Sequence, residues 1–284
     1  MSGTLYVVAT PIGNLEDITL RALRILREVD VIAAEDTRRT ARLLSHHGIS
    51  TPTVSFHEHN TRSRLPQLVG RLQAGQSIAI VTDAGTPGVS DPGRELVQAA
   101  IDRELPVDPI PGASAPLVAL IASGFPLVPF TMFGFAPNRS QDRVVWLSMI
   151  TRTAHTCSFF EAPHRIRQTL DEGGDIFGER PIMVARELTK VHQEFLRGTA
   201  RELSRRIDAP RGEFTIILGP DENTNKNDEV RLNDDEIVRE FWQTTETAGQ
   251  SRRQIVSSLA KRSGRSAKDV YDLIERAKKL GVQP

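Results

Sequence analysis

Short apolar runs alternate with amphipathic segments along the first 123 residues. Between the third and fourth of these runs, apolar residues recur at helical spacing up to Gly75, which ends that helix: Leu65, Leu68, Val69 and Leu72. The runs themselves have the length and β-branched content of buried strands: Leu5 to Ala9, Val31 to Ala34, Thr53 to Phe56, Ser77 to Val81 and Val107 to Ile110. Strands that alternate with helices favour parallel pairing, so the sequence predicts a parallel α/β sheet.

A helix is also expected just before the fifth run. Asp91 followed by Pro92 has the pattern of a helix start, in which the side chain caps and proline takes the first helical position. The inner side of this helix is expected to carry Leu96, Val97, Ala100 and Ile101.

A second α/β segment follows a stretch dense in proline and glycine, Gly124 to Asn138, which reads as a domain connection. Thr199 and Glu202 have capping-box spacing and predict a helix start. The strand candidates of this segment are Thr156 to Phe160, Ile182 to Ala185 and Phe214 to Leu218.

The tail reads as a separate helical unit of the helix-turn-helix kind. Capping-box pairs predict three helix starts in it: Asn233 with Glu236, Ser251 with Gln254, and Ser266 with Asp269. Ser263-Gly264 is expected to separate the last two helices. The predicted organisation is an N-terminal α/β domain, a second α/β domain, an acidic linker and a helical module, at residues 1–123, 124–220, 221–233 and 234–284.

Charge and cysteine content exclude several protein classes. The 36 basic and 36 acidic residues give a formal net charge of 0, so only a local patch can attract a charged partner. The single Cys157 excludes intrachain disulfides and fits a reducing compartment, with the cytoplasm as the default. No signal-peptide pattern opens the chain and no apolar run approaches about 20 residues, so no membrane partner is expected.

Three loops rich in glycine and proline follow strand candidates, at the sheet edge where open α/β sheets bind ligands. They are Thr10 to Leu15, Thr82 to Gly93 and Pro111 to Pro116. Glycines let backbone approach a ligand closely and prolines stiffen a loop, so three converging loops would form the floor of a pocket. Each alone could be an ordinary turn.

Familiar catalytic motifs are absent from this sequence. It contains neither a dinucleotide-binding nor a P-loop fingerprint, and Pro116 stands where a nucleophile elbow around Ser114 would need glycine. His57 and His59 could bind a metal ion, but without a third ligand we expect none, and an exposed or hydrogen-bonded pair is the simpler interpretation.

Charged clusters also end several strand candidates. Glu35 and Asp36 close the second strand; Asp36 could simply cap the following helix, which leaves Glu35 unexplained. In the second half, the clusters at 160–165 and 185–190 could equally be paired ions on a solvated rim.

Together these segments resemble the ribosomal small-subunit RNA 2′-O-methyltransferase I family, within the tetrapyrrole-methylase-like superfamily. The resemblance covers almost the whole chain in order, and its motifs are highly specific. The motifs are VATPIGNLEDITLRAL, AEDTR, SFHEHN, VTDAGTPGVSDPG, PIPGASA, FFEAPHRI, ARELTK and GEFTIIL.

This resemblance implies two α/β domains with S-adenosylmethionine in the cleft between them, and a homodimer. It also implies methylation of the ribose 2′-hydroxyl of one cytidine in the decoding region of 16S ribosomal RNA in the small ribosomal subunit. Carried over residue by residue, the cofactor contacts would be Pro11, Asp83, Ala84, Gly85, Thr86, Ser114, Ala115, Phe160, Glu161, Ala185 and Glu213.

The chemistry itself leaves two sets of candidates open. A ribose hydroxyl is a poor nucleophile, so a nearby base would help, and the candidates are Glu35, His57, Glu58 and Lys190. A local RNA surface would need cations, and the candidates are Arg38, Arg39, Arg62, Arg64, Arg252, Arg253, Lys261 and Arg262. For the tail, solvated helix faces explain the charges equally well.

Two rival functions remain. The first is a methylase acting on a tetrapyrrole or another small molecule, because a shared fold does not fix the substrate. The second is a DNA-binding regulator that uses the C-terminal helices and senses a ligand with its front domains.

Overall fold

The computed structural model describes residues 2–88, 93–207, 211–221, 234–247, 251–263 and 265–279. The chain divides into two compact units, Met1–Pro220 and Asp221–Pro284. The expected helix cap at Asp91-Pro92 and almost all of the expected linker lie outside the described residues. No helix in the described ranges is long and apolar enough to span a membrane.

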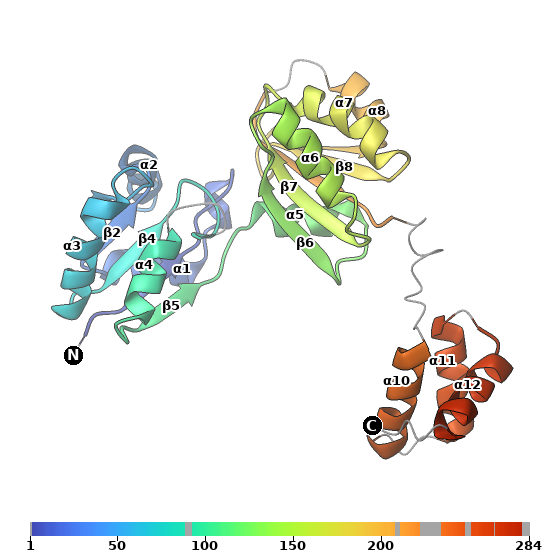
Figure 1. The fold of residues 1–284 in the computed structure, drawn as a ribbon. Helices are drawn as coiled ribbons and strands as arrows, with labels where there is room; N and C mark the ends of the chain where they lie inside the picture. The colour runs from blue at the N-terminus through green and yellow to red at the C-terminus, as the bar shows by residue number, and fades with distance from the viewer. Residues whose placement is uncertain are drawn as a thin grey trace. The chain divides into compact units, whose positions relative to one another are not determined.

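The first sheet is parallel throughout, as the alternation of strands and helices predicts (Figure 1). Its strand order is β3-β2-β4-β1-β5, so the first, second and fourth strands of the chain occupy the centre. Four of the five strands begin where the apolar runs begin. The strands are β1 (Leu5–Val8), β2 (Val31–Ala34), β3 (Thr53–Ser55), β4 (Ile78–Val81) and β5 (Val107–Ile110).

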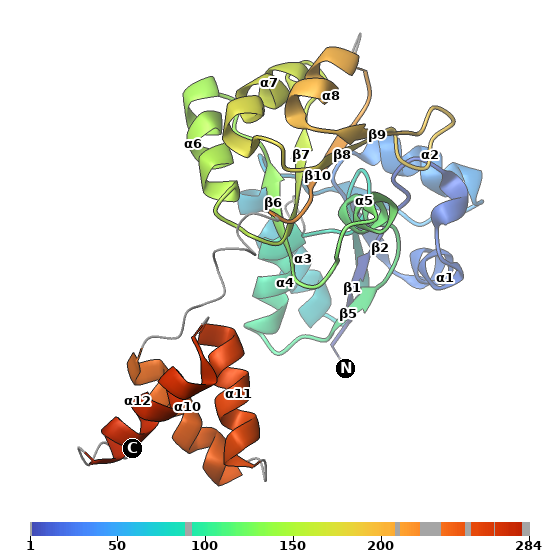
Figure 2. The same cartoon turned by 90° about the vertical axis from the view of Figure 1, so that its right-hand side faces the viewer.

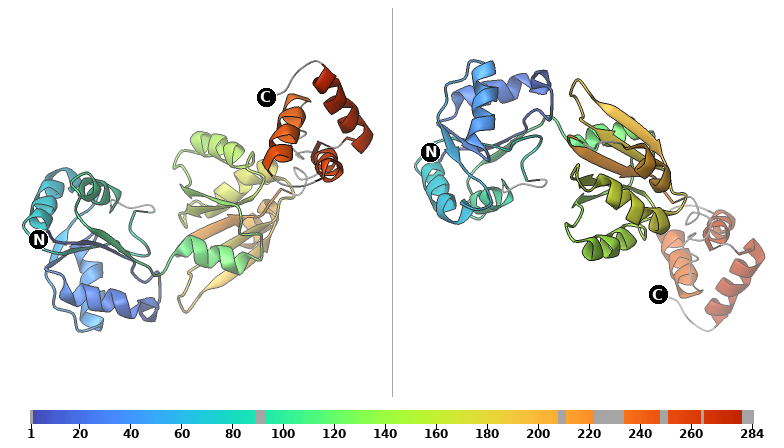
Figure 3. Two further views of the ribbon diagram at one scale, coloured as in Figure 1. Left: turned by 90° about the horizontal axis from the view of Figure 1, so that it is seen from below. Right: turned by 90° about the horizontal axis from the view of Figure 1, so that it is seen from above.

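Helices cover both faces of this sheet (Figure 3). Alternate residues of β2 point to opposite faces: Val31 and Ala33 pack in one core cluster, and Ile32 and Ala34 in the other. The helices α3 (Thr61–Gln73) and α4 (Gly93–Ile101) pack on the first face, and α1 (Leu20–Glu28) and α2 (Thr37–His46) on the second. A short 3₁₀ helix, η1 (Leu15–Asp17), precedes α1.

One residue of the expected inner side of α4 is not inside. Leu96 and Ala100 are buried, but Ile101 is 55% exposed at the last position of the helix. The predicted helix is therefore correct, but the predicted burial of Ile101 is wrong, because the helix ends at this residue.

The second sheet has the order β6-β7-β10-β8-β9 and mixes strand directions. β6 pairs with β7 in parallel, and every other neighbouring pair is antiparallel. β10 lies at the centre, although it is the last strand in sequence. The strands are β6 (Phe130–Phe135), β7 (Thr156–Glu161), β8 (Ile182–Arg186), β9 (Glu194–Gly198) and β10 (Phe214–Leu218).

Both edge strands of this sheet escaped the sequence analysis. The stretch Gly124 to Asn138, interpreted as a connection only, contains β6, and no strand was expected at β9. Edge strands are half exposed and need no buried apolar run, so β6, which lies between proline residues, resembles a loop in sequence.

Helices cover both faces of the second sheet as well (Figure 2). On β8, Ile182 and Val184 belong to the core cluster formed with α6 (Ser140–Ile150), α7 (Ile166–Phe177) and α8 (Ala200–Arg206). Met183 and Ala185 face the other way, toward α5 (Ala115–Ser123). The expected capping box of Thr199 and Glu202 is present at the start of α8.

The helix α5 ends at the domain boundary that the sequence predicts near residue 123. This helix contacts β10 and β7 of the second sheet, although its sequence directly follows the first sheet. The same core cluster contains Ile12 from the loop after β1. The predicted limits of the four segments, 1–123, 124–220, 221–233 and 234–284, stay predictions.

The second unit consists of α10 (Asp234–Thr247), α11 (Arg252–Ser263) and α12 (Ala267–Lys279), the three expected helices of the tail. Their shared core includes Phe241, Leu259 and Ile274. Ser266 accepts a hydrogen bond from the Asp269 amide at the start of α12, as its spacing predicts. Asn233 and Gly264 lie outside the described residues.

Candidate functional site

The three glycine- and proline-rich loops of the first sheet meet. The backbones of Thr10 and Gly85 exchange two hydrogen bonds, of 2.9 and 3.0 Å, which tie the loop after β1 to the loop after β4. Thr86 Oγ1 donates a 3.2 Å hydrogen bond to the Ala113 carbonyl and so joins the loop after β5. Gly85 has a φ of +84°, a conformation that favours glycine at this junction.

A cavity of about 340 Å³ lies over this junction. Its volume is within the range of about 300–1,000 Å³ that is typical of small-molecule sites. Both sheets contribute to its lining: Ile12, Ala84, Gly85, Thr86, Ser114, Ala115, Pro116, Phe135, Phe160, Glu161, Ala162, Pro163, Glu213, Phe214 and Thr215. We call it the main cavity.

Most of the cofactor contacts that the family resemblance implied line the main cavity. Those that do are Ala84, Gly85, Thr86, Ser114, Ala115, Phe160, Glu161 and Glu213. Pro11 and Asp83 line a neighbouring cavity instead. Ala185 is fully buried beneath α5 and lines neither.

Ile12 and Pro116 line the main cavity and belong to the loops that were expected to form its floor. Five further lining residues were not predicted: Phe135, Ala162, Pro163, Phe214 and Thr215. Phe135 stands on the strand that was interpreted as a connection. Its ring lies 5.0 Å from that of Phe160 across the β6–β7 pair, so detecting β6 would have found it. Phe214 and Thr215 depend on strand pairing that no local motif reveals.

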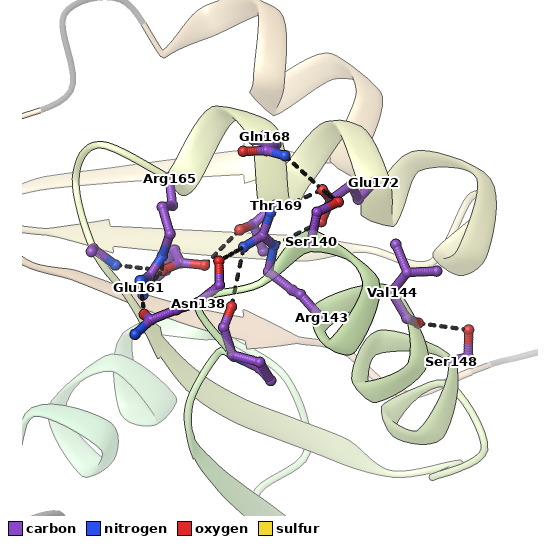
Figure 4. A network of polar contacts seen from close by, with 12 residues as sticks. Asn138, Ser140, Arg143, Val144, Ser148, Glu161, Arg165, Gln168, Thr169 and Glu172 are labelled. Atoms are coloured by element: carbon purple, nitrogen blue, oxygen red, sulfur yellow. Dashed lines mark hydrogen bonds and ion pairs between the residues drawn. The ribbon is translucent and has the colours of Figure 1, made fainter.

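Glu161 is the most enclosed acid of the main cavity (Figure 4). Its carboxylate accepts hydrogen bonds from the Ala162 amide at 2.6 Å, from Arg165 Nε at 2.9 Å and from Thr169 Oγ1 at 2.5 Å. Its side chain is 0% exposed. Glu161 is paired with Arg165, as one interpretation of this cluster expected, but the pair is buried and does not lie on a solvated rim.

A buried arginine supports the same wall (Figure 4). The side chain of Arg143, 1% exposed, binds both oxygens of Glu172, at 2.7 and 2.9 Å, and donates to the carbonyls of Pro137 and Asn138. Burial alone would raise the pKa of Glu172, but hydrogen bonds from Arg143 and Ser140 outweigh burial and lower that pKa. Arg143 thus fixes the segment after β6 to α7.

A second polar group lies at the end of β8. Lys190 Nζ is 2.9 Å from Glu187 Oε1 and 3.3 Å from Glu213 Oε2. Burial lowers the pKa of Lys190, but the hydrogen bond that Lys190 donates to Glu187 and the charges of both acids outweigh burial and raise that pKa. The ammonium group is therefore protonated at neutral pH.

The loop that carries Lys190 has an unusual backbone. Glu187 and Thr189 both have a positive φ, of 51° and 63°, which costs energy in residues other than glycine. Thr189 Oγ1 accepts a hydrogen bond from the Asn14 amide at 3.0 Å. A Cβ on Gly13 would lie 2.6 Å from the Leu188 carbonyl oxygen, so only glycine lets the two loops approach this closely.

The neighbouring cavity, of about 470 Å³, shares Glu213 with the main cavity. Its lining is Thr10, Pro11, Leu15, Arg39, Thr40, Arg42, Leu43, Thr82, Asp83, Lys190 and Glu213. We call it the cationic cavity, since three basic side chains line it.

Of the four base candidates, only Lys190 lines either cavity. Glu35 accepts a hydrogen bond from the Asp83 amide at 3.1 Å, which gives it a structural task between two loops. Glu58 is exposed and, like His57, lines neither cavity. The ring of His57 lies 5.9 Å from that of His59.

The candidate RNA-binding cations of the first unit differ in pairing. Arg38 binds Asp36 at 3.2 and 3.0 Å, and this hydrogen bonding lowers the pKa of Asp36 to about 2. Asp36 also caps α2, so the structural alternative was correct for this residue. Arg39 pairs with Asp83 at 3.4 Å.

The other candidate cations are on α3 and in the tail. Arg62 and Arg64 are exposed on α3, and Arg64 donates to Gln67. Arg252 and Arg253 are exposed in the first turn of α11. The side chains of Lys261 and Arg262 lie outside the described residues.

The main cavity is chemically suited to S-adenosylmethionine. Its aromatic and aliphatic walls and exposed loop backbone suit a nucleoside. Its ionisable lining residues, Glu161 and Glu213, are both acids, which favours a positively charged sulfonium. Among the described residues, no group of three His, Cys, Asp or Glu side chains could hold a metal ion.

Comparison with known proteins gives consistent matches. The family model described as Tetrapyrrole (Corrin/Porphyrin) Methylases matches residues 4–204. A protein of Halalkalibacterium halodurans named "Ribosomal RNA small subunit methyltransferase I" is 50% identical over 218 residues, which cover 76% of this chain and 75% of that protein. A protein of the same name from Synechocystis is 42% identical, over 95% of this chain and 97% of its own length.

A solved structure is similar in fold. The uroporphyrin-III C-methyltransferase of Thermus thermophilus, complexed with S-adenosyl homocysteine, superposes with a TM-score of 0.54 at 20% sequence identity. The match covers 79% of this chain and 100% of that one.

Proposed function

Because the chain belongs to the ribosomal RNA small subunit methyltransferase I family, within the tetrapyrrole methylases, we propose that it methylates one ribose 2′-oxygen of 16S ribosomal RNA. The methyl donor is S-adenosylmethionine, and the target is a cytidine in the decoding region of the small ribosomal subunit. One observation carries this proposal: a nucleoside-sized cavity with two carboxylates adjoins a cavity with three cations, and Glu213 lines both.

The cofactor is proposed to occupy the main cavity. The backbone of Ala84 to Thr86 and of Ser114 and Ala115 would contact it closely, and the rings of Phe135 and Phe160 would pack against its flat base. Glu161 would act as a fixed negative charge, since its three hydrogen bonds hold it in one orientation. Pro11 and Asp83 would contribute from the neighbouring loops.

When bound, the cofactor supplies an activated methyl group. The 2′-oxygen would form a bond to the methyl carbon as the carbon–sulfur bond breaks with its electron pair going to sulfur, and the hydroxyl proton would pass to water. In-line displacement depends mainly on alignment, which loops tied at Thr10, Gly85 and Thr86 can provide.

Lys190 is the candidate among the four predicted residues that fits this step best, but not as the base. Its ammonium, protonated and held by Glu187 and Glu213, can donate a hydrogen bond and stabilise negative charge developing on the ribose oxygen. Glu35 is proposed to position the loop of Asp83 rather than to contact the substrate.

The RNA is proposed to contact the first unit through Arg38, Arg39, Arg62 and Arg64. In the second unit the contacts would come from Arg252, Arg253, Lys261 and Arg262. Arg252 and Arg253 are in the first turn of α11, where the helix dipole disfavours cations, so they do not serve helix stability. A role in phosphate binding explains them better.

A second copy of the chain is proposed to cover an exposed apolar surface of the second sheet. β6 is an edge strand, and large apolar side chains are exposed on it and on α5: Leu117, Ile121 and Phe130. Exposed apolar side chains next to an open strand edge are typical of an interface. We also propose a cytoplasmic location, where small subunits assemble and Cys157 stays reduced.

The proposal is tested by transfer of labelled methyl groups to 30S subunits and to naked 16S RNA that both lack the modification, followed by mapping of the labelled nucleotide. Label on a single ribose 2′-oxygen is the expected result. Cofactor binding without transfer to either RNA, and with transfer to a porphyrin or corrin precursor, would assign a small-molecule methylase instead. Specific duplex DNA binding without methyl transfer would assign a regulator.

A further inference from the structure

The cationic cavity contains three basic side chains in different electrostatic states. Lys190 is held by two carboxylates, Glu187 and Glu213. Arg39 lies 3.4 Å from Asp83. Arg42 is exposed and has no ion-pair or hydrogen-bond partner for its guanidinium among the residues that the structure describes.

Two of these basic side chains, Arg39 and Arg42, lie on the same face of α2. Arg39 and Arg42 are three residues apart, so their side chains are neighbours on the helix surface. Both line the same cavity, together with the loops after β1 and β4. Arg38, one turn before Arg42, binds the helix-capping Asp36 and does not line this cavity.

The guanidinium of an arginine carries five N–H donors in a planar fork that matches the spacing of phosphate oxygens. In an arginine without a partner that lines a cavity, these donors are available to a ligand. Glu213 connects this cavity to the main cavity, in which the methyl donor is proposed to bind. A phosphate held in the cationic cavity would therefore flank the reacting ribose.

We propose that Arg42, supported by Arg39, binds the RNA phosphodiester next to the target ribose. This inference rests on the proposed function and specifies its substrate subsite. It assigns a role to a residue that no sequence motif singled out.

The test measures methyl transfer to unmodified 30S subunits by wild-type protein, Arg42→Ala and a matched control, Arg71→Ala. Arg71 is an exposed arginine without an ion pair in the described part of the chain, in the last turn of α3. That turn lies at the amino edge of the first sheet, opposite the site, because α3 leads directly into β4.

Loss of one charge-assisted phosphate contact is expected to raise KM for Arg42→Ala by roughly tenfold, with little change in kcat. A plot of the logarithm of the RNA affinity against the logarithm of the salt concentration should also become less steep, by about 0.7 to 1 in slope. Arg71→Ala should match wild type in KM and in salt dependence. Arg42→Lys should lose less than Arg42→Ala, because lysine keeps the positive charge but lacks the forked guanidinium donors.

A second experiment identifies the phosphate. A synthetic RNA strand carrying one uncharged methylphosphonate linkage, placed in turn at each position around the target cytidine, is measured for binding to wild type and Arg42→Ala. One linkage should weaken binding to wild type and have no further effect in Arg42→Ala. Equal effects in both proteins at every position would overturn the assignment.

The outcomes separate this inference from the proposed function. If wild type transfers no methyl group to RNA, the proposed function fails. If wild type is active and Arg42→Ala equals Arg71→Ala in KM and salt dependence, only the inference fails. A loss of S-adenosylmethionine affinity in Arg42→Ala would also overturn it, because the cation would then serve the carboxylate of the cofactor.

Discussion

Removing the guanidinium of Arg143 tests whether the buried network of Figure 4 holds the wall of the main cavity. In Arg143→Met, Glu172 loses two hydrogen bonds and the carbonyls of Pro137 and Asn138 each lose a donor. Breaking a buried ion pair from one side costs about 3–5 kcal/mol. Glu172 keeps bonds from Ser140 and Gln168, so the low end of this range, about 3 kcal/mol, is expected.

For a unit of this size, about 3 kcal/mol corresponds to a fall in Tm of about 6–12 °C. Calorimetry and urea titration of the full chain would measure it. A companion variant is Glu172→Gln, which keeps an amide oxygen for Arg143 but leaves the buried guanidinium without its counter-charge, so a loss of similar size is expected. A double variant, Arg143→Met with Glu172→Met, should lose less than the sum of the two single Met variants.

The same substitution should weaken cofactor binding, because the segment fixed by Arg143 follows directly after Phe135, which lines the main cavity. Calorimetric titration with S-adenosylmethionine, well below the reduced Tm, would measure that affinity. Unchanged Tm together with unchanged affinity in Arg143→Met would refute the reasoning, since the buried guanidinium would then support neither the fold nor the cavity.

Three further outcomes are expected. Gly13→Ala should lower methyl transfer and cost about 1–3 kcal/mol of stability, because its Cβ would meet a backbone carbonyl. The control is Gly48→Ala, at a position with a φ of +61° and open space, which should cost about 1 kcal/mol or less and keep activity. Equal methyl-transfer activity of the two variants would contradict this prediction. The lowered pKa values of Glu172 and Glu187 contribute stability that is fully present above the ordinary value of 4.5 and is lost as the pH falls through the lowered values. Below pH 4.5 the free energy of unfolding should therefore fall more steeply in wild type than in Glu172→Gln, and equal pH dependence of the two in urea titrations would contradict this. Deleting everything after Gly219 should weaken RNA binding and its salt dependence and spare cofactor affinity; unchanged RNA affinity would exclude a contact role for the tail.

Sequence reasoning worked best where burial dictated the pattern. The strands Val31 to Ala34 and Phe214 to Leu218 are buried on both faces, and their limits were predicted to the residue. β6 was missed because an edge strand carries exposed residues and lies here between prolines. A strand of that kind has no periodic signal of its own and depends on its neighbour for pairing.

The candidate site divides in the same way. Loops that carry glycine and proline at strand ends, such as Ala84 to Thr86, are visible in sequence and do line the main cavity. The roles of Glu35 and Arg38 were not visible, because their partners Asp83 and Asp36 are fixed only by the folded loops. Arg42 has no motif at all, and only the shape of the cavity distinguishes it from other exposed arginines.

The central place of β10 has a consequence for synthesis of the chain on the ribosome. This strand is the last of the second sheet to be made, yet it lies between β7 and β8 and pairs with both. The nascent chain can complete the first sheet early, but its second sheet lacks its middle until residue 218 has emerged. Phe214 and Thr215 also line the main cavity, so this cavity cannot form before nearly the whole first unit has been translated.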